Sequence, residues 1–192
     1  MQNVLISGGT GLIGKRLTQL LLERGYGVTV LTRRPKQSLR ACLTYSMWNP
    51  EQRELNNDDI TKADFVINLA GAGVSDNRWN EKYKRIILGS RIQSTRLLVD
   101  KLNALDHDVG CFISASGIGY YGLDNEGILH EDAPAGRDFM ASVCREWEIE
   151  AKRLNDNIRL FIPRIGIVLS TAGGALAEII KPVRFFVGAS LG

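Results

Sequence analysis

The stretch Val4-Leu5-Ile6-Ser7-Gly8-Gly9-Thr10-Gly11-Leu12-Ile13-Gly14 decides the fold. It is a short apolar run followed by a glycine-rich turn, and an amphipathic segment over residues 15–24 continues from it. This order predicts a strand, a tight turn and a helix, the first unit of a doubly wound sheet. The glycines fit two spacings at once, Gly9-x-Gly11-x-x-Gly14 and Gly8-x-x-Gly11-x-x-Gly14.

The glycines of this turn predict a site for a dinucleotide. One glycine permits the tight turn, a second lets the backbone approach a pyrophosphate, and a third lets the helix pack close to the strand. The phosphates would then lie over free N–H groups at the positive end of the helix. The residues expected to bind the cofactor here are Gly8, Gly9, Thr10, Gly11, Leu12, Ile13 and Gly14.

The end of the second expected strand, over residues 27–31, indicates which dinucleotide is bound. Domains that prefer NAD place Asp or Glu there to bind the ribose hydroxyls, whereas this chain has Thr32-Arg33-Arg34. A carboxylate would repel a 2′-phosphate, and a guanidinium can hold it through two parallel hydrogen bonds. Thr32, Arg33 and Arg34 therefore favour NADP over NAD. The alternative is that both arginines are solvated loop charges.

Length and composition set further bounds. The 192 residues fit one domain, and 44% apolar residues is typical of a globular protein. A net charge of +3, with no basic run among aromatics, argues against nucleic acid as a partner. Because no apolar stretch is long enough to span a bilayer and a strand follows Met1 almost at once, we expect no signal peptide.

The three cysteines, Cys42, Cys111 and Cys144, are far apart and form no C-x-x-C motif. We interpret them as reduced thiols in a cytoplasmic protein and expect neither a disulfide nor a metal site. A reactive Cys144 is an alternative, although a cysteine buried on a helix more often packs as a small hydrophobe.

The rest of the chain alternates between expected strands and helices. This alternation predicts a Rossmann-type α/β fold, a doubly wound parallel sheet with helices on both faces, and one NAD(P)-binding domain over 1–192. The further expected strands are 43–48, 63–69, 109–114 and 158–162. The further expected helices are 79–105, 139–154 and one after 174. Asn56–Asp59 is expected to form a turn, and 164–169 an extended segment. The helical residues expected in the core are Ile87, Ile92, Thr95, Leu98, Val99, Leu102, Phe139, Val143 and Trp147.

Small and polar residues follow two of these strands, where such folds bind ligands. Leu69, Ala70 and Gly71 end one strand, and their size lets the backbone approach the cofactor. Ser116, Tyr120 and Tyr121 follow another, in a glycine-rich loop that is placed to meet a substrate. The alternative for this loop is a polar surface with packed tyrosines.

Several stretches together resemble the extended short-chain dehydrogenase/reductase superfamily. Within it, they resemble the atypical "epimerase family" of NAD-dependent epimerase/dehydratase-like proteins, of the bacterial YfcH type. Members of this family continue well beyond the position that corresponds to Gly192, so the resemblance implies a truncated chain that lacks the substrate-side C-terminal part. The stretches are 7–14, Leu-Thr-Arg (31–33), Ile-Asn-Leu-Ala-Gly-Ala (67–72), Arg78-Trp79, Ser90-Arg91-Ile92, Gly119-Tyr-Tyr-Gly122, Val143-Cys144-Arg145, Trp147-Glu148 and Arg164-Ile-Gly-Ile-Val-Leu169.

The superfamily's usual chemistry uses a tyrosine that exchanges a proton with the substrate, a lysine four residues on, an orienting serine and an upstream asparagine. The resemblance implies that Ser116 is that serine, and that it also contacts the cofactor. Met140 and Cys144 stand where the Tyr-x-x-x-Lys pair would be, and Arg91 stands where the asparagine would be. A thioether cannot give a proton, and a neutral thiol cannot supply a lysine's charge.

Two functions follow from the resemblance. The first is an NADP-dependent oxidoreductase or nucleotide-sugar epimerase with Tyr120 or Tyr121 as the acid, Ser116 as the orienting group and Arg91 as the positive group near the tyrosine. The second is an NADP(H)-binding sensor or scaffold without turnover. The polar residues around the expected nicotinamide favour the enzyme. Its partners would be a small-molecule substrate, such as a carbonyl compound or a sugar nucleotide, and a second copy in a homodimer.

Overall fold

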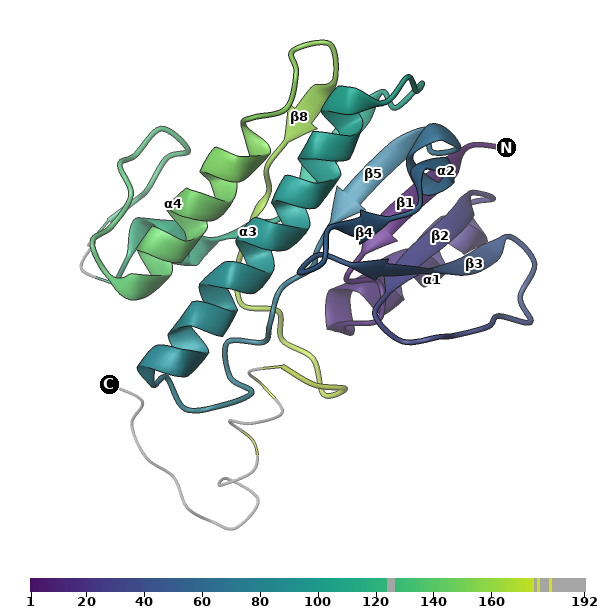
Figure 1. Cartoon of the computed structure of the whole chain (residues 1–192). Helices are drawn as coiled ribbons and strands as arrows, with labels where there is room; N and C mark the ends of the chain where they lie inside the picture. Colours follow the sequence, from purple (N-terminus) through teal and green to yellow (C-terminus); the bar gives the residue numbers. More distant parts are fainter. Residues whose placement is uncertain (124–126, 175, 177–179, 181–192) are drawn as a thin grey trace.

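A seven-stranded sheet in the order β4-β3-β2-β1-β5-β6-β8 forms the centre of the molecule (Figure 1). The computed structural model describes residues 1–123, 127–174, 176 and 180. Neighbouring strands are parallel, except that β4 runs antiparallel to β3. The strands are β1 (Asn3–Ser7), β2 (Gly27–Thr32), β3 (Leu43–Asn49), β4 (Glu54–Leu55), β5 (Phe65–Asn68), β6 (Cys111–Ser114) and β8 (Arg159–Phe161).

The strand order confirms the predicted doubly wound sheet. From β1 the chain adds β2 and β3 on one side, and it then crosses over to add β5, β6 and β8 on the other. The strand order therefore reverses between β1 and β5. Ligands of open α/β sheets bind outside the carboxyl ends of the strands at such a reversal. In this chain those ends lead into the glycine-rich turn after β1 and the small residues after β5.

Helices cover both faces of the sheet, as predicted (Figure 1). On one face, α1 (Leu12–Glu23) packs through Leu17 and Leu21 on a core that includes Val4 and Val30. The other face carries α2 (Asn57–Thr61), α3 (Glu81–Ala104) and α4 (Phe139–Ala151), with α3 and α4 side by side. The larger core on that face includes Leu5, Leu31, Ile60, Val66, Leu98, Phe112 and Ala151.

Three local expectations need correction. Asn56–Asp59, predicted as a turn, leads into α2, because the Asn56 side chain accepts a hydrogen bond from the Asp58 N–H and caps a helix. Ile92 is only half-buried, and Ser94 and Leu97 belong to the buried face of α3 instead. The glycine-rich loop predicted to hold Ser116, Tyr120 and Tyr121 contains a short strand, β7 (Ser116–Gly117), and a 3₁₀ turn, η1 (Ile118–Tyr121).

The segment predicted as extended after 163 forms a second small sheet. Its strand, β9 (Arg164–Ile165), pairs in parallel with β7 and places Arg164 opposite Ser116. The helix predicted after 174 falls mainly outside the described residues. Among the helices that the structure describes, none is long and apolar enough to cross a bilayer.

Candidate functional site

The glycine-rich turn after β1 has the geometry that its sequence predicts. Gly8 has a φ of 72°, and a Cβ on it would lie 2.6 Å from the Leu69 carbonyl carbon, so β1 and β5 leave no room for a side chain. A Cβ on Gly14 would overlap the Gly8 carbonyl oxygen. Gly11 is the N-cap of α1 and supplies no side chain to the helix end. The first backbone N–H groups of α1 are therefore offered to an anion.

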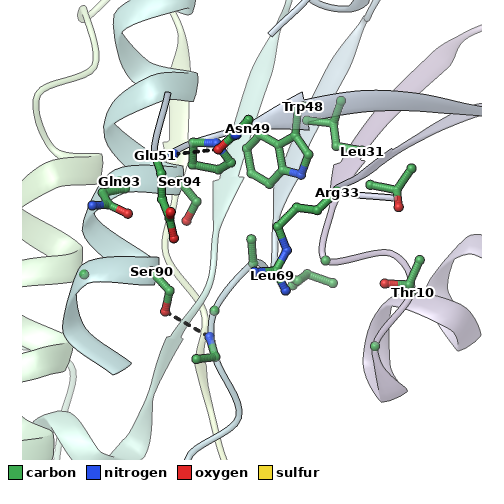
Figure 2. A pocket seen from close by; sticks show the side chains of 18 of the residues that line it. Thr10, Leu31, Arg33, Trp48, Asn49, Glu51, Leu69, Ser90, Gln93 and Ser94 are labelled. Carbon is green, nitrogen blue, oxygen red and sulfur yellow. Dashed lines mark hydrogen bonds between the residues drawn. The ribbon is translucent and has the colours of Figure 1, made fainter. Parts of the chain in front are cut away.

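A cleft of about 760 Å³ opens beside this turn (Figure 2). Eight of the predicted cofactor residues lie in its wall: Gly8, Thr10, Gly11, Thr32, Arg33, Leu69, Ala70 and Gly71. Figure 2 shows Thr10 and Arg33 on one side of the cleft, with Glu51, Ser90 and Gln93 on the other. The structure thus brings together the turn after β1, the end of β2 and the loop after β5.

A second pocket of about 710 Å³ adjoins the cleft and shares Thr10, Thr32 and Arg33 with it. Arg34 and Lys36 complete its positively charged wall. The Thr32 hydroxyl fixes this loop, because it donates to the Arg34 carbonyl at 2.9 Å and accepts from the Arg34 N–H at 3.2 Å. Three cationic side chains around one concave site favour an anionic ligand group.

The other predicted cofactor residues lie outside the two described linings. Gly9 and Gly14 act through packing, and a Cβ on Gly9 would lie 2.7 Å from Val30 Cγ1. Leu12 and Ile13 lie in the first turn of α1. Ser116 is buried elsewhere.

The end of β3 and one face of α3 also line the cleft, and the sequence analysis missed them. Their contributions are Met47, Trp48, Asn49, Pro50, Glu51, Arg85, Ile86, Gly89, Ser90, Gln93 and Ser94. The position of Trp48 and Asn49 at the carboxyl end of a parallel strand was a signal for this role. Ser90 stood in one of the family-like stretches, but no local pattern placed it or the other α3 residues at the cleft. In the structure the Ala72 N–H donates to Ser90 Oγ at 2.9 Å, which joins α3 to the loop after β5.

Ser116 and Tyr121 belong to a buried polar cluster. Ser116 Oγ donates to Glu148 Oε1 at 2.7 Å, and both side chains are buried. Glu148 also accepts from Arg164, whose Nη1 donates to the Tyr121 hydroxyl at 2.8 Å. The Tyr120 and Tyr121 rings meet edge to face, with their centroids 5.5 Å apart. The hydroxyl proton that Ser116 would offer to a substrate is thus directed to Glu148.

Arg91 lies behind the loop that follows β5. Its Nη1 donates to the Ala72 and Ile87 carbonyls at 3.0 Å, and its guanidinium lies 5.2 Å from the Trp147 ring centroid. Burial lowers the pKa of this guanidinium. Within the described part of the chain, its hydrogen bonds go to these carbonyls and not to Tyr120 or Tyr121. Arg91 therefore supports the shape of the loop that follows β5.

The positions that replace the Tyr-x-x-x-Lys pair face η1. A Cβ on Gly119 would lie 3.4 Å from Met140 Cβ and 3.9 Å from Cys144 Sγ, and one on Gly117 would lie 3.7 Å from that sulfur. The backbone of the 116–121 segment thus packs directly on α4 at these two positions. Across the described residues, we find no group of three His, Cys, Asp or Glu side chains that could hold a metal ion.

Comparison with known proteins agrees with this geometry. Residues 4–159 match the family model described as "NAD dependent epimerase/dehydratase family". The chain is 38% identical over 194 residues to "Epimerase family protein SDR39U1 homolog, chloroplastic" from Arabidopsis thaliana, covering 98% of this chain and 55% of that protein.

Two crystal structures of similar proteins share the fold. The structure of human epimerase family protein SDR39U1 (isoform2) with NADPH has a TM-score of 0.83 at 32% identity, over 96% of this chain and 60% of that one. The nucleoside-diphosphate sugar epimerase from Corynebacterium glutamicum has a TM-score of 0.80 at 31% identity, over 100% of this chain and 39% of that one. The chain thus spans less than two thirds of the length of these relatives.

Proposed function

Since the chain belongs to the NAD dependent epimerase/dehydratase family, we propose that it binds NADP(H) as the cofactor-binding part of an oxidoreductase or nucleotide-sugar epimerase. The observation that carries this proposal is the junction of two pockets. The glycine-rich turn lines the larger one, and Arg33, Arg34 and Lys36 surround the smaller one. The NADPH in the structure of the human relative supports the choice of cofactor.

The residues of the two pockets fit the parts of this cofactor. The turn has no room for a side chain at Gly8, Gly9 or Gly14, and it leads into the uncapped start of α1, which suits a pyrophosphate. Arg33 and Arg34 suit a 2′-phosphate, because guanidinium groups bind phosphate through paired hydrogen bonds. Leu69, Ala70 and Gly71 line the same cleft as the turn. A nicotinamide supplies hydride-transfer chemistry when it is bound.

The second candidate function is an NADP(H)-binding sensor or scaffold without turnover. Two observations favour it. Met140 and Cys144 replace the usual tyrosine and lysine, and the Ser116 hydroxyl is directed to Glu148. The enzyme is favoured by Tyr120, whose hydroxyl has no hydrogen bond to a described residue. The YfcH-type membership, the homodimer and the cytoplasmic location remain predictions.

Titration of the purified chain with NADPH and with NADH tests the cofactor. We expect NADPH to bind at least about tenfold more tightly, which corresponds to ~1.4 kcal/mol from the 2′-phosphate contacts. Equal or tighter binding of NADH would contradict the proposal. Incubating the natural full-length protein with NADPH and a panel of carbonyl compounds and sugar nucleotides then separates the two functions. Intact binding with neither cofactor oxidation nor epimer formation would favour the sensor.

A further inference from the structure

The Arg164 guanidinium is held on one edge by a buried carboxylate. Its Nε donates to Glu148 Oε1 at 2.8 Å, and its Nη2 donates to Glu148 Oε2 at 3.0 Å. Glu148 is 3% exposed and also accepts from Ser116. A two-bond contact of this kind fixes both the position and the plane of a guanidinium.

The other edge of the guanidinium reaches the two tyrosines of η1 unequally. Nη1 donates to the Tyr121 hydroxyl and to the Glu131 carbonyl, both at 2.8 Å. The guanidinium carbon lies only 3.5 Å from the centroid of the Tyr120 ring, so Arg164 covers the face of that ring rather than its hydroxyl. The Tyr120 hydroxyl forms no hydrogen bond with a residue that the structure describes, and the side chain is partly exposed.

We propose that Tyr120, and not Tyr121, presents its hydroxyl to a polar ligand at the surface of η1, and that Arg164 is the positioning residue that creates this difference. The inference rests on the proposed function for the identity of the ligand, a carbonyl compound or a sugar. The Tyr121 oxygen is occupied as an acceptor by Arg164, and its ring is held in place. The Tyr120 hydroxyl can donate its proton to a substrate oxygen and regain one from water.

Acetylation of the purified chain with N-acetylimidazole tests which hydroxyl is available without any need for turnover. With peptide mapping by mass spectrometry, we expect Tyr120 to be acetylated about tenfold faster than Tyr121, the order of protection that one hydrogen bond provides. In Arg164→Gln and in Arg164→Lys, the Tyr121 rate should rise toward that of Tyr120, because neither side chain can form the guanidinium fork.

The matched control is Arg145→Gln, which removes an exposed arginine of α4 that, among the described residues, pairs with the adjacent Glu146. It should leave the ratio of the two rates unchanged. Faster acetylation of Tyr121 in the wild-type chain would overturn the proposal. An unchanged ratio of the Tyr120 and Tyr121 acetylation rates in a folded Arg164→Gln chain would also overturn it. If that variant fails to fold, the ratio in the wild-type chain alone tests the proposal.

Turnover by the natural full-length protein tests the role of Tyr120 in the proposed reaction. Tyr120→Phe should lower kcat by about 10²–10⁴-fold with a smaller change in KM, as expected for loss of an acid group. Tyr26→Phe, which alters a tyrosine packed on Phe65 away from η1, is the control. An unchanged kcat in Tyr120→Phe would overturn the assignment. If the wild-type protein shows no turnover while Tyr120 is acetylated first, the enzyme proposal fails and the assignment of the available hydroxyl stands.

Discussion

Asn68 and Thr95 are joined by a buried hydrogen bond of 2.8 Å, from Asn68 Nδ2 to Thr95 Oγ1. Asn68 ends β5, and its Oδ1 accepts from Ser7 Oγ, at the end of β1, at 2.6 Å. Thr95 lies on α3 and also accepts from Trp147 Nε1 of α4 at 2.8 Å. One chain of buried polar groups therefore ties together the two strands at the point where the strand order reverses and the two helices behind them.

Replacing Asn68 with Ala should lower the free energy of unfolding by about 1–3 kcal/mol, because buried donors and acceptors on Ser7 and Thr95 lose their partner. Urea unfolding followed by circular dichroism measures the change. Asn77→Ala, at an exposed position, is the control and should change the stability little. Equal stability of the two variants would contradict the role given to this network.

Replacing Gly14 with Ala should weaken NADPH binding by about tenfold or more, or ~1.4 kcal/mol. The new Cβ overlaps the Gly8 carbonyl oxygen, so α1 must move away from the turn that is proposed to hold the phosphates. Isothermal titration calorimetry measures the affinity. Gly110→Ala is the matched control, because a Cβ there meets nothing within 4 Å. If both variants bind NADPH as the wild type does, close packing at Gly14 is not required for the site.

Replacing Arg34 with Ser should weaken NADPH binding by roughly 1.5–3 kcal/mol, the contribution of a hydrogen bond to a charged group. NADH has no 2′-phosphate, so its affinity should stay the same. Arg40→Ser removes the same charge from the same loop, outside the lining of the smaller pocket, and serves as the control. A parallel loss of affinity for both coenzymes would show that Arg34 acts on the fold of the loop and not on the phosphate.

Local pattern predicted the central strands and the helices that cover them. The run from Val4 to Gly14 carries the strand, the turn and the helix start within one short segment. Arg164 and Ser116 face each other only because β9 returns beside β7, and no periodicity in either segment indicates that pairing. The same holds for Ser90, which reaches the cleft through a loop contact. Contacts between distant segments depend on packing that local propensity does not encode.

Glu148 should make part of the stability depend on pH. Burial alone would raise the pKa of this carboxyl, but the hydrogen bonds from Arg164 and Ser116 outweigh burial and hold the pKa below the ordinary value of 4.5. A lowered pKa in the folded state gives stability that is present above pH 4.5 and is lost as the pH falls through the folded-state pKa. The wild-type chain should therefore lose stability in acid more steeply than Glu148→Gln does.

Urea unfolding of both chains between pH 7 and pH 3 measures this difference. The pKa of Glu150 is lowered by its hydrogen bond with Arg96, so Glu150 also makes stability fall in acid, equally in the wild type and in Glu148→Gln. The pKa of Asp59 is raised by burial, so Asp59 has the opposite effect on stability, again equally in both proteins. Only the difference between the two proteins in the slope of unfolding free energy against pH reports on Glu148. Identical slopes would show that the ion pair with Arg164 adds no pH-dependent stability.

The cysteines should differ in their rates of alkylation. Burial raises the pKa of the Cys144 thiol, and the side chain is only 3% exposed, so little thiolate is available to react at neutral pH. Cys42 is exposed. With iodoacetamide and mass-spectrometric mapping, Cys42 should be labelled well before Cys144, and unfolding in urea should make the two rates similar. Labelling of Cys144 as fast as Cys42 in the folded chain would favour the alternative in which Cys144 is a reactive thiol.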